Sequence, residues 1–106
     1  MEYIGNLEYD EALQKEEQIV ICGAGNDLSK IVKKLIEKRL MKKVVVICDN
    51  NPQKWNTQQE GIWIESYESA YQKYPNASYI VYNRYKIAIC RQIQNYVKRI
   101  HFLWVD

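Results

Sequence analysis

The chain has 106 residues, of which 47% are hydrophobic and 26% charged, and its formal net charge is +2 at pH 7. This composition predicts one soluble globular domain, residues 1–106, with a single core. No apolar run approaches the roughly 20 residues that cross a bilayer, and the first residues lack the features of a signal peptide. We therefore expect a cytoplasmic protein without a membrane span. A net charge this small gives no argument for nucleic-acid binding, and we expect no nucleic-acid partner.

The first half of the chain predicts a strand, a helix and a second strand. Residues 1–17 are polar and charged, and we expect a lead-in segment there with a short helix over 9–16. Residues 18–22 form an unbroken apolar run, which suits a strand buried on both faces, and the valine-rich residues 43–48 predict another. The intervening helix carries its apolar side chains at helical spacing, at Leu28, Ile31, Val32, Leu35 and Ile36.

The second half continues the alternation after a polar loop over residues 49–61. Ser66 is placed to cap a helix that ends before Pro75, and residues 85–98 predict a further helix. Three more strands are expected, at residues 62–64, 78–82 and 100–105. Alternating strands and helices favour a parallel sheet with helices on both faces and right-handed crossovers.

Two glycines follow the first predicted strand, and an aspartate ends the second. Gly23 permits a tight turn, Gly25 lets the main chain approach a phosphate, and the next helix offers free N–H groups to an anion. Asp49 stands where strand–helix–strand nucleotide-binding units place an acid that accepts hydrogen bonds from a ribose. The third glycine of the G-x-G-x-x-G pattern falls on Leu28, so the match is partial. These features predict an α/β, Rossmann-like three-layer sandwich with a five-stranded, mainly parallel sheet in the order 3-2-1-4-5.

Ligands of such sheets bind outside the carboxyl ends of the strands. The segments that follow the strands are distant in the sequence, but we expect them to lie together along this edge of the sheet, which we call the rim. A guanidinium after the fourth strand, from Arg84, suits a second phosphate or a sugar acid. Trp55, in the polar loop, either stacks on a base or covers the sheet edge. The candidate binding residues are Gly23, Ala24, Gly25, Asn26, Asp49, Asn50, Asn51, Asn83 and Arg84.

The sequence shows no catalytic constellation and no metal-ligand spacing. His101 stands alone in an apolar strand, without a partner at the spacing of a triad or metal site. Cys22, Cys48 and Cys90 are interpreted as buried, reduced thiols, although Cys22 and Cys48 come close together if their strands are neighbours. We expect no catalysis by this chain alone; within an enzyme it would belong to a nucleotide-sugar-modifying protein or an oxidoreductase.

Three segments together resemble a type of small Rossmann domain found in bacterial surface-polysaccharide enzymes: residues 21–25 (ICGAG), 46–55 (VICDNNPQKW) and 61–66 (GIWIES). Such modules occur in relatives of nucleotide-sugar dehydratases and epimerases, at the N-termini of sugar acyltransferases, and attached to glycosyltransferases or methyltransferases. The resemblance covers residues 18–104. It implies that residues 23–25 form the phosphate turn and that residues 49–51 recognise the nucleoside.

The leading hypothesis is a domain that binds NAD(P) or a nucleotide-sugar and works in polysaccharide or glycoconjugate biosynthesis. Its partner would be a glycosyltransferase or another biosynthetic enzyme, and a homo-oligomer is compatible with the sequence. The alternative is a degenerate Rossmann domain without cofactor that serves as a protein-interaction or assembly module. A third hypothesis is an oxidoreductase subunit that a partner chain completes.

Overall fold

The computed structural model describes residues 2–6, 18–82 and 85–102. Within these ranges, one seven-stranded sheet has the order β1-β7-β6-β2-β3-β5-β4. Neighbouring strands are parallel, except that β4 and β5 are antiparallel. The strands are β1 Glu2–Asn6, β2 Ile19–Cys22, β3 Val44–Cys48, β4 Gln58–Gln59, β5 Ile62–Glu65, β6 Ser78–Val81 and β7 Arg99–Phe102. The helices are α1 Leu28–Glu37, α2 Tyr67–Lys73 and α3 Lys86–Ile93, with short 3-10 turns η3 Met41–Lys43 and η4 Pro52–Lys54.

The predicted fold class is confirmed, but the predicted strand count and full order are wrong. The five expected strands keep their relative order, as β5-β3-β2-β6-β7, and one further strand lies at each edge of the sheet. At one edge, β1 pairs in parallel with β7 inside the segment that was expected to be a polar lead-in. The predicted helix over residues 9–16 lies outside the described residues.

The other edge strand, β4, lies inside the segment that was predicted to be an irregular polar loop. Gln58 pairs with Trp63, and Gln59 pairs with Ile62. The two residues between the strands both have positive φ, 54° at Glu60 and 76° at Gly61. Positive φ at both central positions is the geometry of a two-residue hairpin turn whose twist matches the flanking strands. A two-residue Gln-Gln strand has no apolar alternation, so the pattern could not reveal it.

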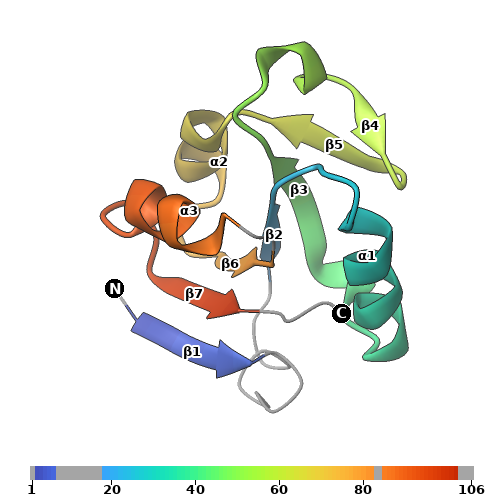
Figure 1. Ribbon diagram of the computed structural model, residues 1–106, viewed down its shortest axis with the longest axis horizontal. Helices are drawn as coiled ribbons and strands as arrows, with labels where there is room; N and C mark the ends of the chain where they lie inside the picture. The colour runs from blue at the N-terminus through green and yellow to red at the C-terminus, as the bar shows by residue number, and fades with distance from the viewer. Residues whose placement is uncertain (1, 7–17, 83–84, 103–106) are drawn as a thin grey trace.

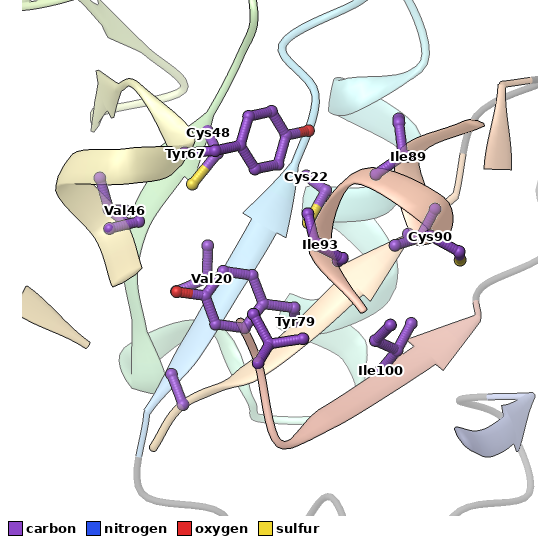
Figure 2. Packing of buried hydrophobic residues seen from close by; sticks show 14 residues of the cluster. Val20, Cys22, Val46, Cys48, Tyr67, Tyr79, Ile89, Cys90, Ile93 and Ile100 are labelled. Carbon is purple, nitrogen blue, oxygen red and sulfur yellow. The ribbon is translucent and has the colours of Figure 1, made fainter. Parts of the chain in front are cut away.

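The helices lie on opposite faces of the sheet, with α1 on one side and α2 and α3 on the other (Figure 1). Successive strand residues point to opposite faces, so each central strand contributes to two cores. On the α1 side, Ile19 and Ile21 pack with the buried face of the helix. On the other side, Val20 and Cys22 pack with α2 and α3 (Figure 2). This burial on both faces explains why β2 is a continuous apolar run.

The helix predictions hold in their central turns and fail near their ends. Ile36, expected on the buried face of α1, is 58% exposed. The third helix ends at Ile93 rather than at residue 98, and Tyr96, which the prediction included in this helix, follows it and is 63% exposed. Ser66 caps α2 as predicted, because its Oγ accepts a hydrogen bond from the Ser69 N–H at 3.1 Å. Among the described residues, no helix has the length and apolar character needed to cross a membrane.

Candidate functional site

The turn between β2 and α1 is built around Gly23, whose φ of 105° is unfavourable for residues with a side chain. The Gly23 N–H donates to the Cys48 carbonyl at 2.6 Å, which joins the turn to the end of β3. The buried Tyr82 hydroxyl donates to the Gly23 carbonyl at 2.5 Å. Burial raises the pKa of Tyr82 to about 12, and the nearby Gly25 backbone N–H acts in the opposite direction. The hydrogen bond from the neutral Tyr82 phenol therefore fixes the position of the turn.

Asp49 connects this turn to the loop after β3. Its Oδ2 accepts a hydrogen bond from the Ala24 N–H at 2.8 Å, and its Oδ1 accepts from the Asn51 N–H at 2.8 Å. The Lys54 ammonium donates to the Ala24 carbonyl at 2.6 Å, so both backbone groups of Ala24 are bound from the same loop. A carboxylate has about four lone-pair positions, and the two backbone bonds leave each oxygen with further capacity to accept.

The nine predicted site residues divide into four groups. Ala24, Gly25 and Asn26 lie in the turn between β2 and α1, where Ala24 is buried and Gly25 and Asn26 are exposed. Gly23, Asp49 and Asn50 line one hollow at the rim, and their predicted roles in binding a ligand stay predictions. Asn51 uses its side-chain oxygen to cap η4, accepting from the Gln53 N–H at 3.1 Å, and its predicted part in recognising the nucleoside stays a prediction. The predicted binding residues Asn83 and Arg84 lie outside the described residues, and their roles stay predictions.

Three adjoining hollows lie along this rim and the neighbouring groove between α2 and α3. Tyr67 and Gln92 line all three. The hollow at the glycine turn has a volume of about 320 Å³ and is lined by Gly23, Asp49, Asn50, Tyr67, Tyr85, Ala88, Ile89 and Gln92. The next, also about 320 Å³, is lined by Asn50, Trp55, Ser66, Tyr67, Glu68 and Gln92. The largest, about 560 Å³, lies between α2 and α3 and is lined by Tyr67, Glu68, Tyr71, Gln72, Gln92 and Tyr96.

The sequence reasoning missed Lys54, Tyr67, Tyr82 and Gln92. Lys54 and Tyr82 act on the glycine turn through single hydrogen bonds that no sequence motif records. Tyr67 lies beside Cys22 and Cys48 at the top of the second core (Figure 2). Burial raises the pKa of Tyr67, which keeps its hydroxyl protonated. Since α2 begins at the carboxyl edge of the sheet, the position of Tyr67 as its first residue was an available signal. Gln92 lies in the last turn of α3, where its position in the sequence gave no such signal.

The cysteines are placed as inert thiols rather than as a reactive pair. Cys22 pairs with Cys48 in the register of β2 and β3, so the expected proximity of the strands is confirmed. Both thiols are free and buried, and burial raises the pKa of each above its ordinary value of 9.0. A thiol that stays protonated is a poor nucleophile. Within the described ranges, no group of three or more His, Cys, Asp or Glu residues is arranged to hold a metal ion.

Comparison with solved structures finds a similarity in fold. The chain is similar to the solved structure of RSP, a Rex-family repressor, with a TM-score of 0.59 over 90% of this chain. The fold is Rossmann-like. Sequence identity in that comparison is 19%, which supports the fold alone, and the match spans 49% of the repressor chain. No family model matches the sequence, and no curated protein matches it either.

The comparison corrects the expected relationship to polysaccharide-biosynthesis modules. That relationship is wrong, because the solved structure to which the chain is similar is a repressor, and neither a family model nor a curated protein matches the sequence. The expected glycosyltransferase partner and the nucleotide-sugar ligand lose their support together with it. The neighbour also gives no support to the expectation that the chain has no nucleic-acid partner. What stands is a Rossmann-like domain whose glycine turn and acidic residue meet at the carboxyl edge of the sheet.

Proposed function

We propose that this rim binds a nucleotide that carries a diphosphate, with NAD as the favoured ligand. The observation that carries the proposal is Gly25, a glycine that the fold does not require. Its φ lies outside the left-handed range, and a Cβ built at this position meets no atom within 4 Å. Gly23, by contrast, needs its positive φ of 105°. Because glycine has no side chain, its presence at an exposed and unstrained position leaves room for a ligand to approach the main chain.

The groups around Gly25 suit a phosphate. Among the described residues, the backbone N–H groups of Asn26 and Asp27 have no hydrogen-bond partner, and they stand at the positive end of the α1 dipole. The Lys54 ammonium lies on the same turn and keeps donors beyond its bond to Ala24. Asp27 brings an opposing negative charge, but its carboxylate lies 3.4 Å from the Lys30 ammonium and is about half exposed, so solvent screens it.

Asp49 supplies the expected partner for a ribose. Its two bonds to backbone N–H groups fix the carboxylate at the end of β3, beside the hollow that begins at Gly23. An acid in this position accepts hydrogen bonds from the 2′- and 3′-hydroxyls of a ribose and repels a 2′-phosphate. The proposal therefore favours NAD over NADP.

Asp49→Asn tests the ribose assignment while keeping the shape of the side chain. We expect the wild-type protein to bind NAD at least about tenfold more tightly than NADP, and the variant to lose most of that preference because the repulsive charge is gone. Calorimetric titration of both proteins with both nucleotides measures the preference. An unchanged preference in the variant would show that Asp49 does not face the ribose.

A second candidate function is a contact surface for another protein. Trp63 on β5 is 55% exposed, and Tyr85 and Ile87 at the start of α3 are 64% and 72% exposed. Tyrosine and tryptophan are enriched at protein interfaces, and Ile87 adds exposed apolar area beside Tyr85. Absence of a melting-temperature shift with NAD, NADP and S-adenosylmethionine at about millimolar concentration would favour this candidate over nucleotide binding.

A further inference from the structure

The side-chain amides of Asn50 and Gln92 join two segments that are 42 residues apart in the sequence. The Asn50 Nδ2 donates to the Gln92 Oε1 at 3.0 Å, and the Gln92 Nε2 donates to the Asn50 Oδ1 at 2.9 Å. Asn50 directly follows the ribose-binding candidate Asp49, whereas Gln92 belongs to α3. The two amides therefore form a closed pair at the hollow lined by Trp55 and Tyr67.

That hollow has the features that a flat heteroaromatic ring needs. Its volume of about 320 Å³ lies beside the loop of Asp49, and two of its lining side chains are aromatic. The Trp55 ring is fixed in orientation, because its Nε1–H donates to the Asp49 carbonyl at 2.7 Å. Tyr67 is 4% exposed and so presents a rigid edge. Aromatic walls with a few fixed polar groups are typical of sites for ring-shaped ligands.

The amide pair has a hydrogen-bonding pattern that adenine shares. A primary amide presents a donor beside an acceptor, and adenine presents its exocyclic amine beside a ring nitrogen, so the two can form paired hydrogen bonds. In the amide pair, Asn50 presents to Gln92 the same adjacent donor and acceptor that adenine would present. A base that enters the hollow can take that place without leaving either group unsatisfied, because both side chains are exposed and water serves the released amide.

We propose that Gln92 is the residue that selects adenine: its amide leaves Asn50 when the ligand binds and pairs with the edge of the base. This inference rests on the proposed nucleotide function. Gln92 fits the role better than Asn50, because it lines all three adjoining hollows and its longer side chain reaches further into them. Glu68 lines the same hollow and, as a carboxylate, only accepts hydrogen bonds, which favours a base with an exocyclic amine.

The test compares NAD with etheno-NAD, in which a two-carbon bridge ties up the exocyclic amine and the adjacent ring nitrogen of adenine. We expect the wild-type protein to bind NAD about tenfold or more tightly than the etheno analogue, the size of one paired base contact. Gln92→Met keeps the length of the side chain and removes the amide. In this variant NAD affinity falls to that of the analogue, while affinity for the analogue changes little.

Gln94→Met is the matched control, since Gln94 follows α3 and lines a different hollow with Ile87 and Phe102. It should keep the preference for NAD, and the melting temperatures of all three proteins without ligand verify folding. A preference that survives in Gln92→Met, or one that is absent from the wild type, overturns the proposal while leaving nucleotide binding in place. A wild-type protein that binds neither compound overturns this inference together with the proposed function.

Discussion

Replacing Leu28 with glycine is expected to destabilise the protein by about 3 to 5 kcal/mol, although it restores the third glycine of the G-x-G-x-x-G pattern. Leu28 is the first residue of α1 and is 0% exposed in the core on that side of the sheet. Its side chain packs in one cluster with Ile19, Ile21 and Ile31. Removing it leaves a cavity and adds glycine's loss of backbone entropy. A loss of this size is a large part of the stability of a small domain.

Urea denaturation measures the effect, as a lower midpoint with an unchanged slope. Ser29→Gly is the matched control, because Ser29 is the next residue of the same helix turn and is exposed. That control should cost no more than about 1 kcal/mol, the helix-propensity difference alone. Equal losses in the two variants would show that Leu28 contributes no core packing, and that the missing glycine is a simple departure from the motif.

Stability is expected to fall steeply as the pH rises above about 9. Burial raises the pKa of the Cys22 and Cys48 thiols above their ordinary 9.0, and raises that of Tyr82 from 10.0 to about 12. The unfolded chain loses these protons near the ordinary values, whereas the folded chain retains them. The unfolded state therefore binds fewer protons in this pH window, and each group costs about 1.4 kcal/mol of stability per pH unit once it ionises in the unfolded state.

Free energies of unfolding from urea curves between about pH 8 and pH 11 measure this slope. Tyr82→Phe removes one titrating group, so its slope above the ordinary tyrosine pKa of 10.0 should be shallower than that of the wild type. Comparing slopes separates this effect from the constant cost of losing the hydrogen bond to the Gly23 carbonyl. A stability that is flat across the window would contradict the burial of these groups.

The central fold could be predicted because its information lies in contiguous residues. The run Ile19–Cys22 is buried on both faces of the sheet, so its residues are all apolar and predict a strand without any information about the neighbouring strands. The turn at Gly23 and the acid at Asp49 stand at fixed distances from the strand ends, so they come together in any right-handed strand–helix–strand unit. The structure then adds what spacing cannot show, namely that the Asp49 carboxylate binds the turn itself through the Ala24 N–H.

The remaining features depend on contacts between distant segments. β1 is recognisable only through its pairing with β7, at the far end of the sequence, because Tyr3 and Ile4 stand side by side between polar residues and glycine and give no alternating pattern. Ile36 has the spacing of a buried residue, but it is exposed, because a short helix on a sheet buries a narrower stripe than its apolar pattern suggests. The pair of Asn50 and Gln92 combines two common polar residues, and only the fold brings them together.

The most direct test of the account is the affinity of wild-type protein and Gly25→Ala for NAD, measured by calorimetry together with their melting temperatures. The added Cβ meets no protein atom, so the variant should melt at the wild-type temperature or slightly above it. Its affinity for NAD should fall at least about tenfold, because the Cβ occupies the space in which the phosphates approach the turn. A wild-type protein that binds no NAD at about millimolar concentration, or a variant that binds it equally well, would contradict the claim that this rim is a nucleotide site.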